Sequence, residues 1–332
     1  MQTDSSPTTT EKPPKLRWYQ WRLRSLFLLT LLIAIGMSWL AVTMRDQRRQ
    51  KAVAEEIVKA GGKATTELTW LGRLLRDDSL VRVTEADFSE STTDAKLVYL
   101  QGLSQLQTLA IMEGSEITDA GLVHLQGLSQ LQSLHLGSND VTDAGLVHLR
   151  GLHHLQVLWL DNTKVTDAGL VHLQGLSQLQ WLDLSNTNVT DAGLAHLRGL
   201  TQLQSLDLTG TNITDDVLVY LQGLHQLQVL WLNSTKLTDA GLVHLQGLSQ
   251  LQRLEVCNTK VTDAGLVHLQ GLSQLQWLDL GNTEVTDAGL MYLQGLRQLQ
   301  KLRLNNNNVT DQGIKNLQQA LPKCKIGSWW LK

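Results

Sequence analysis

The sequence predicts an α/β solenoid, a stack of strand, turn and short-helix units, preceded by one transmembrane helix. Three observations lead to this prediction: a constant period of 24 residues, two rhythms of apolar residues within each period, and one uncharged segment of twenty residues. A fixed period of this length is typical of solenoid proteins, whose units pack mainly against their neighbours.

The overall composition is that of an ordinary globular protein. The chain has 332 residues, a formal net charge of −3 and 42% hydrophobic residues, without the basic excess that favours nucleic acid as a partner. Its two cysteines, Cys257 and Cys324, lie far apart in the sequence, which excludes a framework of several disulfides. The unusual feature is ten tryptophans against two phenylalanines. Its meaning depends on where the tryptophans lie.

Residues 1–24 are expected to be a disordered basic tail, because residues 1–14 are rich in Ser, Thr and Pro and cannot bury a core. Residues 25–44 carry no charge, and as a helix they measure about 30 Å, enough to cross the hydrocarbon core of a bilayer. A cleaved signal peptide and a buried helix are the alternatives. We interpret the segment as an uncleaved anchor, since a signal peptide usually has a shorter apolar region and a small-residue cleavage site.

The orientation of this anchor is not decided by charge, because basic residues flank both of its ends in nearly equal numbers. The aromatic residues Trp18, Tyr19, Trp21 and Trp39 fit the aromatic belts at membrane surfaces, which mark depth and not direction. We expect a single-pass protein of the cell membrane, with the short N-terminus inside and the repeat domain outside the cytoplasm.

Residues 45–79 are expected to form a juxtamembrane helix followed by a linker or N-terminal cap. The stretch "RDQRRQKAVAEEIVKAGG" contains good helix formers and stops at Gly61 and Gly62, a common signal for the end of a helix. We expect this helix to carry the chain away from the bilayer surface.

Thr-Asp pairs mark the repeat, and they recur every 24 residues at Thr118, Thr142, Thr166, Thr190, Thr214, Thr238, Thr262, Thr286 and Thr310. Within one unit, Leu182 and Leu184 alternate with polar neighbours as in a strand. Further along, leucines recur at helical or turn spacing, at Leu194, Leu197 and Leu200. Thr190 or Asp191 can cap the first turn of the helix, and Gly199 is expected to end it in a left-handed conformation.

The pattern LxxLxLxxTxVTDAGLxxLxxL resembles a leucine-rich repeat. Its VTDAGL form is similar to that of bacterial single-pass membrane-anchored leucine-rich-repeat proteins and, more distantly, to F-box adaptor repeats. The resemblance covers residues 80–326, about ten repeats, and implies a curved leucine-rich-repeat solenoid with a parallel sheet on its concave face. The position usually given to a stacked Asn is Thr in most units, and a hydroxyl can satisfy the same backbone groups; these are Thr163, Thr187, Thr211, Thr235, Thr259 and Thr283.

The ends of the array are irregular, as terminal repeats usually are. Residues 81–92 look like a degraded first unit. Residues 327–332 are expected to form a C-terminal cap, in which Trp329 and Trp330 cover the last leucine layer. A direct contact of these two tryptophans with a partner is the alternative.

The candidate binding surface lies on the concave face, at strand positions that the leucine pattern leaves free to vary. Four tryptophans and four acids fall there: Trp159, Trp181, Asp183, Asp207, Trp231, Glu255, Trp277 and Asp279. Asp183 and Asp207 would lie on neighbouring strands and repel each other, so stability does not explain them. Acids among large aromatic rings suit a cationic protein segment, or a carbohydrate stacked on Trp. The alternative is a solvated surface on which Trp rings stack across strands, with Trp277 between Arg253 and Lys301.

No cofactor, metal site or catalytic site is predicted. A column of histidines is expected on the convex side without converging ligands, at His124, His148, His172, His196, His244 and His268. The sequence contains no phosphate loop, HExxH or GxSxG motif, and nothing supplies a pocket for the adjacent carboxylates. Cys257 is a candidate exposed thiol, whereas Cys324 replaces a core leucine.

The sequence therefore predicts a membrane-anchored, non-enzymatic binding module that holds a protein or carbohydrate ligand on its concave face. Two alternatives stay open. One is a spacer protein whose repeats were amplified without a specific ligand, and the other is an F-box-like substrate adaptor. The apolar segment and the absence of an F-box-like sequence ahead of the repeats weigh against the adaptor.

Overall fold

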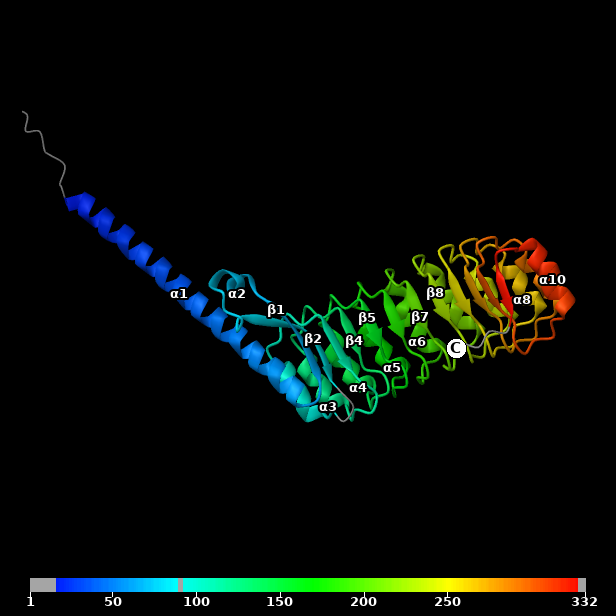
Figure 1. Ribbon diagram of the computed structural model, residues 1–332, viewed down its shortest axis with the longest axis horizontal. Coiled ribbons are helices and arrows are strands. Elements are labelled where there is room, and N and C mark those ends of the chain that lie inside the picture. The colour runs from blue at the N-terminus through cyan, green and yellow to red at the C-terminus, as the bar shows by residue number, and fades with distance from the viewer. Residues whose placement is uncertain (1–15, 89–91, 328–332) are drawn as a thin grey trace, which may run out of the picture.

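The structure is a computed structural model that describes residues 16–88 and 92–327, with side chains from Ser25 onward. A long helix, α1, leads into an elongated stack of repeats with strands on one side and short helices on the other (Figure 1). Trp329 and Trp330 lie outside the described residues, as do residues 1–15 of the expected tail.

Helix α1 spans Leu16–Lys59 without a break. It therefore begins within the expected tail of residues 1–24 and joins the apolar segment directly to the expected juxtamembrane helix. Its part from Ser25 to Lys59 is the one helix in the described chain that is long and apolar enough to cross a membrane. The helix ends as the glycine pair predicts, because Gly61 has a φ of 92° and starts the turn that reverses the chain.

The last turns of α1 cap the first layer of the stack. They pack on β1 (Lys63–Leu68) and β2 (Val81–Phe88), which pair antiparallel. Ile57 is fully buried there, and the side-chain amide oxygen of Gln50 accepts a hydrogen bond of 2.9 Å from the backbone N–H of Val83. A solenoid needs such a cap, because its first unit has no preceding neighbour to cover its apolar face.

One twelve-stranded sheet runs through the described repeats, with strands in sequence order. From β2 onward all neighbours pair in parallel. The further strands are β3 (Thr108–Ile111), β4 (Ser133–His135), β5 (Val157–Trp159), β6 (Trp181–Asp183), β7 (Ser205–Asp207), β8 (Val229–Trp231), β9 (Arg253–Glu255), β10 (Trp277–Asp279), β11 (Lys301–Arg303) and β12 (Lys325–Gly327).

Short helices cover the other side of the core, except α2 (Trp70–Leu75), which lies beside α1 at the N-terminal end of the stack (Figure 1). The other short α-helices are α3 (Asp119–Leu122), α4 (Asp143–Leu146), α5 (Asp167–Leu170), α6 (Asp191–Leu194), α7 (Asp239–Leu242), α8 (Asp263–Leu266), α9 (Asp287–Leu290) and α10 (Asp311–Ala320). The 3₁₀ helices are η1 (Asp94–Leu100), η2 (Val123–Leu125), η3 (Val147–Leu149), η4 (Val171–Leu173), η5 (Ala195–Gly199), η6 (Asp215–Gly223), η7 (Val243–Leu245), η8 (Val267–Leu269) and η9 (Met291–Leu293). The repeats bury their core leucines; Leu182, Leu184 and Leu194 all have 0% exposure.

The Thr-Asp pair joins each repeat to the next. The Thr190 hydroxyl accepts a bond of 3.4 Å from the N–H of Ala192, which confirms Thr190 as the helix cap. Asp191 acts differently: its two carboxylate oxygens accept bonds of 2.7 and 2.6 Å from the backbone N–H and hydroxyl of Thr214, in the following repeat. The same pair of bonds recurs along the stack, accepted by Asp94, Asp119, Asp143, Asp167, Asp215, Asp239, Asp263 and Asp287.

The left-handed residue of the unit lies in the turn after the strand, so the expectation for Gly199 is wrong. Gly199 closes η5 with a φ outside the left-handed region, whereas Asn186 has a φ of 54°. Asn tolerates this conformation better than most residues, because its short side chain can hydrogen-bond locally. The Thr that replaces the stacked Asn acts as expected, since the Thr187 hydroxyl donates a bond of 2.6 Å to the Leu184 carbonyl.

Two glycines of one repeat should respond in opposite ways to alanine. A Cβ on Gly193 would lie 2.4 Å from Oδ1 of Asp167, so Gly193→Ala should displace that carboxylate from Thr190 and lower the free energy of unfolding by about 1 to 2 kcal/mol. At Gly199 the nearest such atom is the Gln174 carbonyl oxygen at 4.0 Å. Gly199→Ala should therefore raise the free energy of unfolding by roughly 0.5 kcal/mol. Urea unfolding of both variants checks this, and equal effects would contradict it.

Candidate functional site

The register of the sheet places the candidate side chains in two rows. Residues 24 apart pair directly, so Trp159, Asp183, Asp207, Trp231, Glu255 and Asp279 follow one another across strands β5 to β10. Trp181 and Trp277 belong to the second row, two residues earlier in each strand. Because residues two apart in a strand point to the same side, both rows share one face of the sheet. We call this side of β4 to β11, opposite the helices, the sheet face.

Aromatic rings stack along the sheet face. The ring centroids of His135 and Trp159 are 5.1 Å apart, and those of Trp159 and Trp181 are 5.3 Å apart. Trp181 then meets Trp231 at 5.4 Å, across the intervening strand β7. The small side chain of Ser205, which is 6% exposed, lies on that strand. Trp159, Trp181 and Trp231, which are up to 72 residues apart in the sequence, thus form one continuous series of ring contacts.

Two cations extend this row towards the C-terminus. The guanidinium of Arg253 lies 5.5 Å from the Trp231 ring centroid and 4.4 Å from that of Trp277. The ammonium of Lys301 lies 4.4 Å from the Trp277 ring, which confirms the predicted position of Trp277 between two cations. We call the series His135, Trp159, Trp181, Trp231, Arg253, Trp277 and Lys301 the aromatic row.

Three tryptophans of the aromatic row have an indole N–H without a hydrogen-bond partner among the described residues. They are Trp159, Trp181 and Trp277, and each of these indole nitrogens is buried. A buried N–H without an acceptor is unfavourable.

The acids lie deeper than the sequence predicts. Asp183, Glu255 and Asp279 are only 6%, 8% and 2% exposed, so the expectation of exposed acids is wrong for these three. The large side chains of the aromatic row stand on the same strands and leave little of the shorter carboxylates accessible.

Hydrogen bonds and ion pairs occupy these buried oxygens. Asp183 accepts bonds of 2.9 and 2.7 Å from the backbone N–H and hydroxyl of Ser185. Glu255 accepts a bond of 2.7 Å from Nε of Arg253 and one of 3.0 Å from the Asn233 amide. Asn233 is not among the residues that the sequence predicts for this site, because a turn residue gives no signal of the partner that it meets one repeat later.

Asp207 differs from the other three acids. It is half-buried, and its Oδ1 accepts a bond of 2.8 Å from the backbone N–H of Thr209. Burial raises its pKa to about 6, and the charges of Asp183 and Glu255 add to this shift. Burial also raises the pKa of Asp183 and of Asp279.

Charge divides the sheet face into two halves. Towards the C-terminus, Arg253 pairs with Glu255, and Arg303 pairs with Asp279 at 3.0 Å. Towards the N-terminus, Asp183 and Asp207 have no Lys or Arg within ion-pair distance among the described residues. Asp161, one repeat earlier, adds its negative charge to the surroundings of Asp183. The N-terminal half of the sheet face, around Asp207, therefore combines aromatic rings with negative charges that no Lys or Arg of the described residues pairs with.

The histidine column holds neighbouring repeats together. Nδ1 of His196 lies 2.8 Å from the amide nitrogen of Gln174, and Nδ1 of His148 lies 2.7 Å from that of Gln126, each partner in the preceding unit. In the part of the chain that the structure describes, no three His, Cys, Asp or Glu side chains converge as metal ligands. Cys257 is half-buried, and burial raises its pKa to about 11, so it is not the exposed thiol that its position suggests. Cys324 is buried, as its core position predicts.

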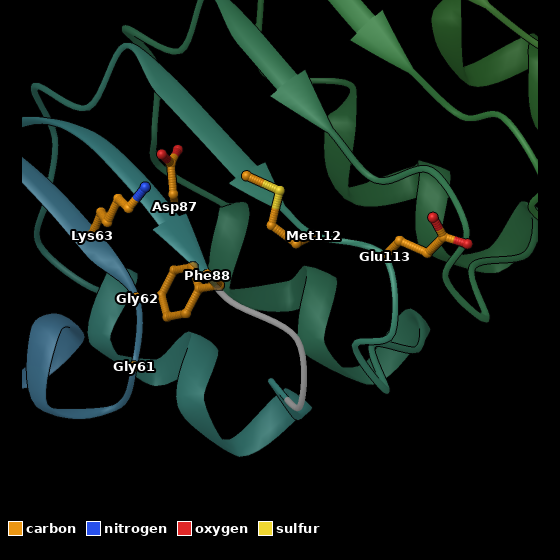
Figure 2. A pocket seen from close by; sticks show the side chains of 7 residues that line it. All are labelled: Gly61, Gly62, Lys63, Asp87, Phe88, Met112 and Glu113. Atoms are coloured by element: carbon orange, nitrogen blue, oxygen red, sulfur yellow. The ribbon is translucent and has the colours of Figure 1, made fainter.

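A separate cleft of about 410 Å³ lies at the N-terminal end of the sheet. Figure 2 shows it between the turn at Gly61 and Gly62 and the ends of β2 and β3, where Phe88 and Met112 lie. The side chains of Lys63 and Asp87 rise from paired positions of β1 and β2. None of the residues that line this cleft belongs to the aromatic row, so we treat the two features as separate.

Comparisons with known proteins agree with the geometry. Residues 130–331 match the family described as leucine-rich repeat region. Among solved structures, the chain is similar to an internalin (inlF) from Listeria monocytogenes, with a TM-score of 0.52, 21% identity, and coverage of 79% of this chain and 94% of that one. It is also similar to internalin C2 (inlC2) from the same organism, with a TM-score of 0.50, 27% identity, and coverage of 64% and 84%. The search of curated proteins finds no match.

Proposed function

Because this chain belongs to the leucine-rich repeat family, we propose that it is a membrane-anchored, non-enzymatic module that binds a partner protein on its sheet face. The observation that carries the proposal is the aromatic row beside uncompensated acids. Half-buried tryptophans are typical anchors of protein interfaces.

The charge pattern supports a cationic segment as the ligand. A lysine or arginine placed over the N-terminal half of the sheet face would approach Asp161 and Asp207, while its aliphatic part would lie on Trp159 or Trp181. A carbohydrate is less well supported, because most of the carboxylate oxygens that would accept hydrogen bonds from its hydroxyls already have partners.

The anchoring part of the proposal depends on α1. Its segment of residues 25–44 has the length and hydropathy of a membrane span. We propose that the repeat domain of residues 80–326 lies outside the cytoplasm, attached through the helix of residues 45–59, whose last turns also cap the stack. Protease access to the repeats from outside intact cells would support this orientation, and protection would contradict it.

A peptide-display experiment tests the binding proposal. The full chain in lipid nanodiscs is screened against random peptides displayed on phage, beside Trp159→Ala/Trp231→Ala and a control, Val171→Ala/Val243→Ala, on the exposed helical side. We expect the wild type to enrich peptides rich in Lys, Arg and apolar residues. The double Trp variant should bind them roughly a thousandfold more weakly, since anchoring tryptophans contribute on the order of 2 kcal/mol each.

Stability measurements keep this result interpretable. Loss of ring stacking should lower the free energy of unfolding of the double Trp variant by only about 1 to 3 kcal/mol. Trp159→Phe/Trp231→Phe should keep both the fold and most of the binding. Enrichment that is equal in all variants would place the binding outside the aromatic row and refute the proposal. Enrichment that is absent from the wild type would favour the spacer alternative, in which the aromatic row only packs on itself.

A further inference from the structure

Helix α2 exposes a cluster of large apolar side chains. Trp70, Leu74 and Leu75 are 61%, 69% and 48% exposed, whereas Leu71 is 2% exposed and holds the helix on the domain. Thr69 caps its start and Arg76 ends it in the left-handed conformation, so this short helix is a defined element and not a frayed loop. Such an exposed apolar cluster marks a contact surface.

The chain path brings α2 back to the end of the apolar span. After the turn at Gly61 and Gly62, the six residues of β1 return alongside α1. They cover about 20 Å at ~3.3 Å per residue. Along a helix this equals roughly 13 residues, which leads from Lys59 back to the neighbourhood of residue 46.

Direct contacts agree with this level. The Thr69 hydroxyl donates a bond of 2.8 Å to the Gln47 side-chain oxygen, and Arg48 pairs with Asp77 at 3.0 Å. Gln47 is three residues beyond Met44, the last residue of the span. Figure 1 shows α2 beside α1, on the side of the domain that faces the N-terminal part of that helix.

Burial along α1 leads to the same conclusion. Residues 25–39 are all exposed, and coverage begins with a stripe at Leu40, Thr43, Met44 and Gln47, which are half-buried. This spacing of three and four residues defines one helix face. The domain therefore covers one side of α1 as far as Leu40, within the apolar span.

Basic residues surround this level. Arg45, Arg48 and Arg49 on α1 are exposed, as are Arg73 and Arg76 at α2. Arg73 and Trp70 also line a cleft of about 450 Å³ between α1 and α2. Exposed Trp and Leu beside Arg are the side chains that favour the boundary between lipid headgroups and acyl chains.

We propose that α2 is a membrane-contacting element, in which Trp70 and Leu74 enter the headgroup boundary of the bilayer that α1 spans. Its basic neighbours would face anionic phosphate groups. Together, α1 and α2 would then hold the repeat domain at one angle to the membrane. A single transmembrane helix can still tilt in the bilayer and rotate about its own axis, and a second contact restricts both motions. This inference rests on the membrane anchoring proposed above.

Lipid quenching of single fluorescent labels tests the inference and the anchoring separately. The full chain carries Cys257→Ser and Cys324→Ala, and a label at one of three exposed positions: Leu74→Cys, Ile33→Cys within the span, or Val243→Cys on the repeats. The vesicles contain equal parts of phosphatidylcholine and phosphatidylglycerol, with bromine on acyl carbons near the headgroup in one preparation and near the chain end in a second, because Ile33 lies at about the middle of the span. We expect the label at position 74 to lose roughly half of its fluorescence in the first preparation, the label at position 33 to lose roughly half in the second, and the label at 243 to lose none in either.

Every other outcome refutes either the contact of α2 with the membrane or the membrane anchor itself. Quenching at position 33 without quenching at position 74 refutes the contact of α2 and leaves the anchor standing. No quenching at position 33 refutes the anchor, and the inference falls with it. A label at position 74 that is shielded from both lipid bromine and aqueous iodide means that protein covers α2, which also refutes the inference.

Discussion

Replacing Asp207 with asparagine should raise the free energy of unfolding at pH 8 by about 2 to 3 kcal/mol and leave it unchanged at pH 4. Asparagine keeps an oxygen that can accept the bond from the Thr209 N–H, so the turn after β7 stays intact. What the substitution removes is a negative charge that burial and the nearby charges of Asp183 and Glu255 disfavour.

The sign of this effect follows from the direction of the pKa shift. The pKa of Asp207 is raised from 3.8 to about 6 in the folded protein. The folded state therefore binds a proton more tightly than the unfolded state, and this contribution to stability is fully present below pH ~4 and is lost as the pH rises through ~6. The wild type carries the full penalty at pH 8, whereas the asparagine variant carries none.

Urea unfolding of the full chain in detergent micelles, at intervals from pH 4 to pH 8, measures the difference. Asp216→Asn is the matched control, because Asp216 is exposed and its replacement should leave the free energy of unfolding unchanged at both ends of the range. A gain that is the same at both ends of the range would refute the raised pKa as its cause. The predicted gain also bears on function: a charge that lowers the stability of the free protein is consistent with a cationic ligand that compensates it.

Asp191→Ala should lower the free energy of unfolding by about 3 kcal/mol, because it removes both bonds that join this repeat to Thr214. The backbone N–H of Thr214 is part-buried and would lose its acceptor. The bonds are strong because the acceptor is ionised; at the equivalent Asp287, the hydrogen bonds from Thr310 lower the pKa of the carboxyl.

Two companion variants separate the bonds from other effects. Asp191→Asn keeps one good acceptor and should lose about half as much stability, while Asp216→Ala should be neutral. Hydrogen exchange should locate the loss at the amides of the units on either side of α6, because a solenoid unit depends on its nearest neighbours. Uniform exchange along the whole stack, or no loss in Asp191→Ala, would contradict this role.

Most of the fold could be predicted from the sequence because the sequence itself is periodic. A constant step of 24 residues makes equivalent positions neighbours, so the rows from Trp159 to Asp279 followed from counting alone. The alternation at Leu182 and Leu184 likewise identified the strand, and its leucines are buried as expected.

The sequence predicted which residues form the candidate site, but not which rings are in contact or how deeply each carboxylate is buried. Counting placed Trp181 and Trp231 on one face, yet it did not reveal that their rings meet across β7 above a small serine. It also gave Asp183 and Asp207 the same character, although only Asp207 stays half-exposed. Side-chain burial depends on how neighbouring rings lean, and no spacing rule encodes that.

The sequence by itself determined the repeating unit, the leucine core and the register of the sheet, because these depend on periods within one unit and on the constant step between units. Only the tertiary structure decided the partners that cross between units or return to α1: Asp191 with Thr214, Asn233 with Glu255, and α2 with the end of the apolar span. The reason is physical: a side chain that reaches into the next repeat, or back along α1, finds its partner through the packing of the whole stack.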